Sequence, residues 1–218
     1  MHRFMSSLMR CGNRIKNCVT LCIRDILSTV KGYYCDKRLG GIDTSYSFND
    51  SFTQGLHEDS LVYSPTGYGT IQKVIDYLKL NKDDVFIDFG CGKGRVIFAV
   101  GTQRLKKVIG VELDKRLTDI AKANLSKLKF NNTPIEILNI NAIDFDPKEG
   151  TIFFMFNPFE YKTMEDVLNN IKNSLISHHR KIRIVYHNPR FKSILDRKDW
   201  LVAGGEIGNT GILVWHNQ

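Results

Sequence analysis

The sequence predicts an α/β protein with a Rossmann-like, doubly wound and mostly parallel seven-stranded sheet, an antiparallel C-terminal strand and an N-terminal helical appendage. Three observations predict it. From about residue 68 onward, short apolar runs alternate with helical patterns five times. The first of these runs ends in a glycine-rich turn directly before a helix. The final two runs are joined by four residues that contain Gly and Asn, as in an antiparallel hairpin.

The expected elements follow from hydrophobic periodicity and from the turn residues between them. Strands are expected over 85–89, 107–112, 135–140, 151–156, 182–186, 200–206 and 211–215. Helices are expected over 95–103, 115–128, 164–175 and 191–195. Because parallel strands need crossover helices, this order places helices on both faces of the sheet.

Composition and charge divide the chain of 218 residues into three zones. Residues 1–38 form a basic appendage with eight Lys or Arg and two Asp, residues 39–66 form a Gly- and Ser-rich connecting loop, and residues 67–218 form the main domain. The net charge of +8 therefore belongs mostly to the appendage, because the remaining 180 residues hold 23 basic and 21 acidic side chains. The charge of the main domain gives no support for nucleic-acid binding.

The appendage carries an apolar stripe at helical spacing, flanked by basic residues. Its members are Ile15, Cys18, Val19, Cys22, Ile23, Ile26, Leu27 and Val30. Such a helix could pack on the main domain, which is the commonest use of an apolar stripe, cover a substrate cleft or rest on an anionic membrane. Neither a spanning segment nor a secretory signal is expected. The five cysteines favour reduced thiols in the cytoplasm, with peripheral membrane contact left open, and no metal site is expected.

The strongest motif is the glycine turn after the 85–89 strand, which contains Asp88, Gly90, Gly92 and Gly94. Alternating glycines permit positive φ and let a ligand approach the backbone, and the following helix offers free amides. A dinucleotide fingerprint starting at Gly90 would need a small residue where Arg95 stands. This argues against a nicotinamide oxidoreductase.

The turn resembles the first motif of class I S-adenosylmethionine-dependent methyltransferases. The resemblance implies that the glycines admit the methionine part of S-adenosylmethionine and that Asp88 holds its ammonium group. Glu112, at the end of the next strand, would accept hydrogen bonds from the ribose hydroxyls, whereas Asp114 is the expected N-cap of the following helix.

The third strand leads to the adenine site that the resemblance implies. Members of the family usually have an acid followed by a small residue there, and this chain has Asn141 and Ala142. The oxygen of Asn141 can accept the same hydrogen bond from the adenine amino group. Asp144 is the second candidate for this role.

The fourth strand ends in Asn157, Pro158 and Phe159, which resemble the Asp/Asn-Pro-Pro-aromatic motif of amino-methylating enzymes. The second proline is missing, which favours an amine or amide nitrogen as acceptor over adenine in DNA. In the motif, the Asn oxygen accepts a hydrogen bond from the target NH₂. His187, after the fifth strand, could take a proton from the amine or could have a structural role.

Together with residues 63–70, these motifs resemble small bacterial class I methyltransferases over about residues 40–218 and, more distantly, seven-strand protein lysine methyltransferases. In this family the segment before the first strand closes over the methionine end of the cofactor. Tyr63, Thr66 and Tyr68 are therefore candidate lid residues, although ordinary helix entry capped by Thr70 would explain each of them equally well.

The predicted function is S-adenosylmethionine-dependent methyl transfer to an amine or amide nitrogen of a protein side chain or a small molecule. Two alternatives remain: a nucleic-acid methyltransferase acting on RNA or DNA, and a cofactor-binding protein without catalysis. Methyl transfer from a sulfonium requires orientation more than acid–base power, so the lack of an obvious catalytic triad fits this prediction.

Overall fold

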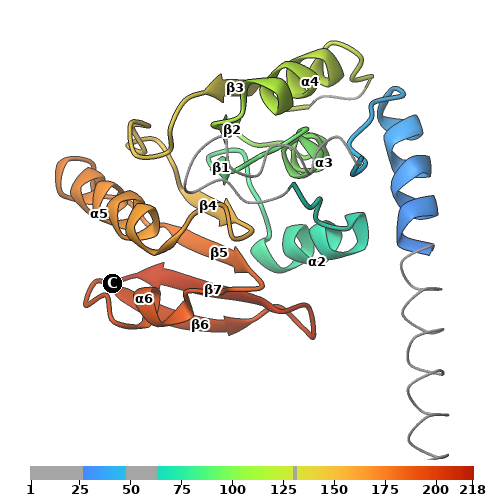
Figure 1. Cartoon of the computed structure of the whole chain (residues 1–218). Helices are drawn as coiled ribbons and strands as arrows, with labels where there is room; N and C mark the ends of the chain where they lie inside the picture. The colour runs from blue at the N-terminus through green and yellow to red at the C-terminus, as the bar shows by residue number, and fades with distance from the viewer. Residues whose placement is uncertain (1–26, 48–62, 130–131) are drawn as a thin grey trace, which may run out of the picture.

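The computed structural model describes residues 27–47, 63–129 and 132–218 (Figure 1). Its centre is a seven-stranded sheet in the order β3-β2-β1-β4-β5-β7-β6. The strands are β1 (Val85–Phe89), β2 (Lys107–Glu112), β3 (Ile135–Asn139), β4 (Ile152–Met155), β5 (Arg183–His187), β6 (Leu201–Glu206) and β7 (Ile212–Asn217). The first five are parallel, and β7 is antiparallel to both β5 and β6. This confirms the predicted Rossmann-like fold.

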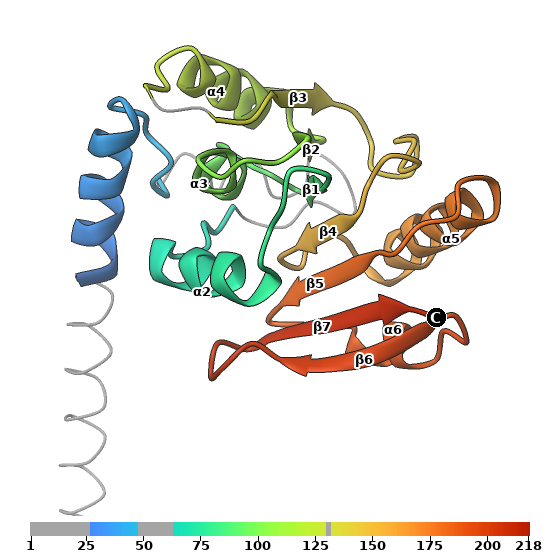
Figure 2. The ribbon, with the colours of Figure 1, turned by 180° about the vertical axis from the view of Figure 1, so that it is seen from behind.

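Helices cover both faces of the sheet (Figure 2). They are α2 (Tyr68–Leu78), α3 (Arg95–Gly101), α4 (Lys115–Leu125), α5 (Tyr161–Ser177) and α6 (Lys192–Asp196). Apolar residues of α2, α3 and α4 share one core cluster with the sheet, and those of α5 and α6 share the other. The sequence placed the start of α5 three residues too late, because Tyr161 begins the helix and is itself exposed.

Alternation along the central strands divides their side chains between the two cores. Phe86 of β1 stacks on Phe154 of β4 on the α2 and α3 side, with ring centroids 6.1 Å apart. Phe89 stacks on Phe153 on the α5 side, also at 6.1 Å. All five residues of β1 are buried, as expected for a central parallel strand covered on both faces. This packing fixes the carboxyl end of β1, where the glycine turn begins.

The N-terminal helix is described from residue 27 and continues to residue 39. Six members of the predicted stripe, Ile15, Cys18, Val19, Cys22, Ile23 and Ile26, lie outside the described residues. The two described members, Leu27 and Val30, face solvent, with 62% and 46% of their surface exposed. Asp36 and Ile42 are instead buried against the main domain. The boundary drawn at residue 38 stays a prediction.

Candidate active site

The glycine turn has the backbone conformation that the sequence predicts. Gly90, Gly92 and Gly94 have φ angles of +74°, +54° and +94°. A Cβ on Gly92 would lie 2.3 Å from the ring of Tyr63, and one on Gly90 would lie 2.7 Å from Cβ of Pro158. The space that the missing side chains leave is thus taken by other parts of the chain, and at Gly94 by Phe98. The glycines bring the predicted lid and the Asn157-Pro158 turn against the end of β1.

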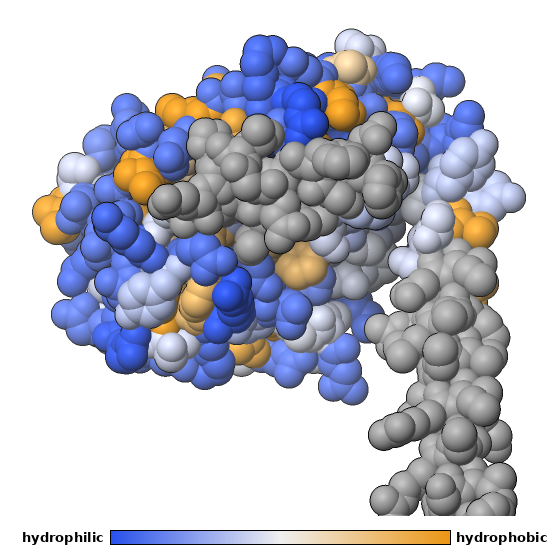
Figure 3. Space-filling view, in the orientation of Figure 1, coloured by the Kyte–Doolittle hydropathy of each residue, from blue (hydrophilic) through white to orange (hydrophobic). Residues whose placement is uncertain are grey.

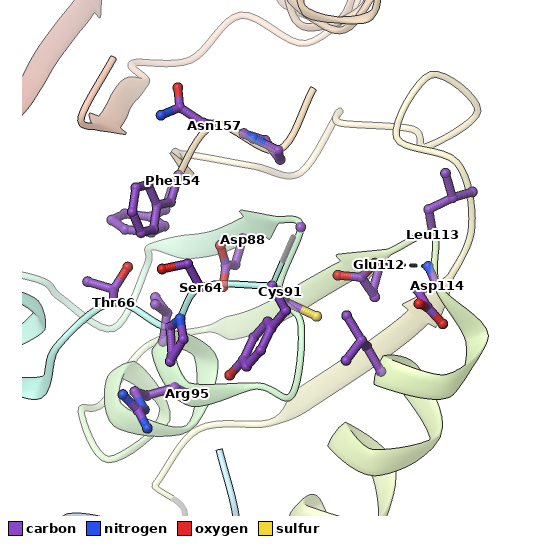
Figure 4. A pocket seen from close by; sticks show the side chains of 17 residues that line it. Ser64, Thr66, Asp88, Cys91, Arg95, Glu112, Leu113, Asp114, Phe154 and Asn157 are labelled. Atoms are coloured by element: carbon purple, nitrogen blue, oxygen red, sulfur yellow. Dashed lines mark hydrogen bonds between the residues drawn. The ribbon is translucent and has the colours of Figure 1, made fainter. Parts of the chain in front are cut away.

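Two adjoining hollows open at the carboxyl ends of the central strands and share Gly90, Glu112, Leu113 and Pro158. The first hollow is also lined by Tyr63, Thr66, Asp88 and Asn157. Figure 4 shows Asp88 and Glu112 in its middle, with Asn157 and Thr66 on other sides of the space. The second hollow is also lined by Asn141, Ala142 and Phe159. Together they form a cleft at the switch point between β1 and β4, where open α/β sheets bind ligands.

Asp88 and Glu112 place two buried carboxyl groups in this cleft. Burial raises the pKa of Asp88 well above its ordinary value, and the charge of Glu112 raises it further. Burial also raises the pKa of Glu112, although hydrogen bonds from the amides of Asp114 and Gly92 partly offset this. Ionised forms of both groups would gain from a cationic ligand, because an opposite charge nearby favours the charged form.

Glu112 connects the glycine turn to the start of α4. Its Oε2 accepts a hydrogen bond from the amide of Gly92 (2.8 Å), and its Oε1 accepts one from the amide of Asp114 (2.9 Å). Each oxygen keeps one lone pair for a ligand hydroxyl. Asp114 caps α4 as predicted, because its side chain accepts a hydrogen bond from the amide of Arg116.

Asn157 lies at the tip of β4 in a left-handed conformation, with φ of +44°. Its Oδ1 accepts hydrogen bonds from the hydroxyl of Tyr186 (2.8 Å) and the amide of Arg190 (3.1 Å), and its Nδ2 donates to the carbonyl of Asn188 (2.8 Å). Both lone pairs of this oxygen are thus engaged within the chain. The side chain holds the β4 turn against the turn after β5, and a target NH₂ would have to displace one of these donors.

His187 stands behind the cleft rather than in its lining. Its ring centroid lies 4.1 Å from that of Phe156, and its Nδ1 forms a hydrogen bond of 3.3 Å with the hydroxyl of Thr66. Burial lowers the pKa of His187 to about 4. The imidazole is therefore neutral near pH 7 and only weakly basic, and Thr66 connects it to the first hollow.

A segment far away in sequence holds two residues that line the cleft, Tyr63 and Arg95. We call residues 40–45 the strap. Arg95 donates from Nε to the hydroxyl of Thr44 (2.7 Å) and from Nη2 to its carbonyl oxygen (2.9 Å). The hydroxyl of Tyr63 donates to the same carbonyl oxygen (2.8 Å). The strap thus orients Tyr63, the residue that lies against Gly92.

Not every predicted site residue reaches the cleft. Gly92, Gly94, Tyr68, His187 and Asp144 do not line either hollow. The hydroxyl of Tyr68 instead donates to Asp36 (2.5 Å), and its ring lies 5.2 Å from the guanidinium carbon of Arg95. The sequence interpretation missed several lining residues, namely Ser64, Pro65, Cys91, Arg95, Phe154 and Phe156. Proximity to the glycine turn and the β4 tip was the one signal that pointed to them.

Comparisons with known proteins agree with this geometry. The family described as "Histone methylation protein DOT1" matches residues 53–147, which include the glycine turn and Glu112. A protein-lysine N-methyltransferase of Saccharolobus islandicus is 30% identical over 95 residues, which cover 43% of this chain and 58% of that protein. A ribosomal RNA small subunit methyltransferase A of Mycoplasma capricolum is 29% identical over 99 residues, covering 45% of this chain and 33% of that protein.

The fold comparison finds the same architecture. A candidate S-adenosyl-L-methionine-dependent methyltransferase from Methanococcus maripaludis superposes with a TM-score of 0.56 and 14% identity, covering 69% of this chain and 85% of that chain. Over the matched segment the chain is therefore similar to S-adenosylmethionine-dependent methyltransferases, and its sheet has the architecture of the class I fold. The chain spans somewhat more than half of the length of the Saccharolobus protein and about a third of the length of the Mycoplasma protein. Among its described residues, no helix has the length and apolarity needed to cross a bilayer.

Proposed function

We propose that the protein is a methyltransferase that binds S-adenosylmethionine in the cleft and transfers its methyl group to an amine or amide nitrogen of a protein side chain or a small molecule. When bound, the cofactor supplies a methyl group activated on a positively charged sulfur. The observation that carries the proposal is the position of Asn157 and Pro158, which line the same hollow as Asp88 and Glu112.

The residues of the cleft fit the cofactor. Asp88 has no hydrogen-bond partner within the described part of the chain, and burial destabilises its charged form, so an ammonium group would satisfy it. Glu112 keeps free lone pairs for ribose hydroxyls. Asn141 and Ala142 line the second hollow, as an adenine site would require. Oδ1 of Asn141 already accepts the amide of Ile143 (3.1 Å) and has one lone pair left.

The acceptor side of the first hollow is apolar and aromatic, since Phe154, Phe156 and Pro65 line it beside Thr66. A neutral amine can enter such a lining at low desolvation cost, whereas an ammonium ion must first lose its proton. Because Asn157 uses its side-chain oxygen within the chain, we assign it to positioning Pro158 and the β4 turn. His187 acts through Thr66, with a neutral imidazole that orients this hydroxyl.

A second candidate is methyl transfer to RNA, which the similarity to a ribosomal RNA methyltransferase favours. The near-neutral main domain argues against it, because phosphate contacts need clustered Lys and Arg side chains. A protein that binds the cofactor without catalysis is the third candidate. The cytoplasmic location inferred from the cysteine pattern stays a prediction.

The test incubates the purified full chain with methyl-labelled S-adenosylmethionine and with separated protein, RNA and small-molecule fractions of a lysate. Label in protein or small amines that survives mild base supports nitrogen methylation, because methyl esters are cleaved by base. Label confined to RNA would establish the second candidate instead. If calorimetry shows cofactor binding but no fraction receives label, only the third candidate remains, a protein that binds the cofactor without catalysis. An Asp88→Asn variant serves as the negative control, since it should not hold the cofactor.

A further inference from the structure

The N-terminal helix over residues 27–39 docks on the main domain by its small and polar side. At Gly32 the helix approaches the guanidinium of Arg95, where a Cβ would lie 3.5 Å from Nη2. One turn later, the carboxylate of Asp36 accepts hydrogen bonds from the amide of Thr44 (2.9 Å) and the hydroxyl of Tyr68. Gly32 and Asp36 are both buried.

The opposite side of the same helix is apolar and faces solvent. Leu27, Val30 and Tyr34 stand three and four residues apart, so they form one row along the helix. Their exposed fractions are 62%, 46% and 64%, and Tyr33 beside them is 59% exposed. In Figure 3 a hydrophobic patch lies on the outer side of this helix, at the right of the view. The helix thus docks by its polar side and exposes its apolar side. A helix that only packs on its own domain would do the opposite and bury its apolar side.

Positive charge surrounds the row. Lys31, Lys37 and Arg38 are exposed, and Nζ of Lys37 lies 5.4 Å from the ring centre of Tyr33. The one acid of the described helix, Asp36, is buried on the docked side. Lys37 lies against Tyr33 of the apolar side, whereas Lys31 and Arg38 lie at the edge of the docked side, where they line a hollow with Tyr68 and Ile71. The exposed surface of the described helix thus carries these three cations and no anion.

We propose that Leu27, Val30, Tyr33 and Tyr34, with Lys31, Lys37 and Arg38, bind the surface of an anionic lipid bilayer. An interfacial helix needs an apolar side for the acyl boundary, cations for the lipid phosphates and amphipathic aromatic rings at the level of the headgroups. RNA would use the cations but not the apolar row. A second copy of the chain would cover the row but would bring two sets of three cations together.

The experiment measures co-sedimentation of the full chain with vesicles of phosphatidylcholine alone and with vesicles that contain about one third phosphatidylglycerol. The expected result is binding to the anionic vesicles that weakens as salt rises. The double variant Leu27→Glu/Tyr34→Glu should bind at least about tenfold more weakly, because it removes buried apolar area and adds negative charge. Each of Lys31→Gln, Lys37→Gln and Arg38→Gln should lower binding about fivefold.

The matched control is Ile176→Glu on α5, because Ile176 is 73% exposed and α5 lies on the other side of the molecule (Figure 1). This variant should bind vesicles like the unchanged chain. Circular dichroism and calorimetry with S-adenosylmethionine check that each variant is folded and keeps its cofactor site, so a failure of the proposed methyl transfer would be seen separately. Equal binding to both kinds of vesicle would overturn the proposal. Unchanged binding of Leu27→Glu/Tyr34→Glu would overturn it too, as would binding to RNA or dimerisation in place of vesicle binding.

Discussion

The guanidinium of Arg95 binds both the hydroxyl and the carbonyl oxygen of Thr44, over 2.7 and 2.9 Å. These two residues are 51 positions apart, and both are buried. Their contact attaches the strap to the helix that follows the glycine turn. The first residue of α3 therefore both lines the cleft and holds the strap.

Removing this guanidinium should weaken the attachment of the strap and, through the strap, the position of Tyr63 in the cleft. Arg95→Ala removes the two hydrogen bonds that the guanidinium donates to the buried Thr44 and should lower the free energy of unfolding by about 1.5–3 kcal/mol, the range for hydrogen bonds to charged groups. Urea unfolding measures this loss, and calorimetry should show weaker cofactor binding because Tyr63 shares the Thr44 carbonyl. Arg104→Ala at an exposed position should change stability by less than about 0.5 kcal/mol. Equal stability of the two variants would contradict the role of Arg95.

A methyl group on Gly92 should displace Tyr63, which lines the cleft. Gly92 and Gly208 have nearly the same φ, +54° and +52°, but a Cβ on Gly92 would collide with Tyr63, whereas one on Gly208 would meet nothing within 4 Å. Both alanine variants carry a backbone strain of about 1–2 kcal/mol. Cofactor affinity measured by calorimetry should fall more than tenfold in Gly92→Ala alone. Similar affinity in both variants would show that Tyr63 does not form part of the cofactor site.

Asp88→Asn should stabilise the cofactor-free chain while removing its cofactor affinity. With a folded-state pKa raised above 3.8, Asp88 retains its proton at pH values where the unfolded chain has lost it. Its contribution to stability is therefore full below 3.8 and is lost as pH rises through the raised folded-state value. Urea unfolding should show that the free energy of unfolding of the variant exceeds that of the unchanged chain by an amount that grows as pH increases. Asp83→Asn, at an exposed position, is the control, and a pH-independent gap would argue against a raised pKa at Asp88.

The imidazole of His187 should stay neutral near pH 7. Its folded-state pKa of about 4 lies below the ordinary 6.5, so its contribution to stability is present above 6.5 and is lost as pH falls towards 4. Nitrogen NMR of labelled histidine should show this ring titrating near 4, and His187→Gln identifies the signal by removing it. Titration near 6.5 would mean that the ring is not buried against Phe156 and would restore it as a candidate proton acceptor.

The parts of the site predicted from the sequence are those built by local rules. Asp88 and Glu112 end neighbouring parallel strands, and parallel strands end at the same edge of the sheet, so their spacing after the apolar runs was enough to bring them together. The cap at Asp114 likewise depends only on residues two positions away.

The parts that were missed depend on contacts between distant segments. Thr44 lies in a polar loop without periodicity, and nothing in the sequence relates it to Arg95. The sequence identified Asn157 as a candidate residue but did not predict its hydrogen-bond partners. Its oxygen accepts hydrogen bonds from Tyr186 and Arg190, and the positions of these donors depend on how the turn after β5 folds. The direction of Leu27 and Val30 stayed open for a related reason: periodicity defines a stripe but not which side of a helix docks.

The position of β7 has a consequence for how the chain folds. β7 follows every other strand in sequence but lies between β5 and β6 in the sheet. During synthesis, β6 therefore has no neighbour to pair with until residues 212–217 have left the ribosome, and β5 keeps an open edge for the same interval. An open edge is where strands of other chains attach. A chain that has not yet placed β7 therefore exposes two strand edges on which other chains can pair.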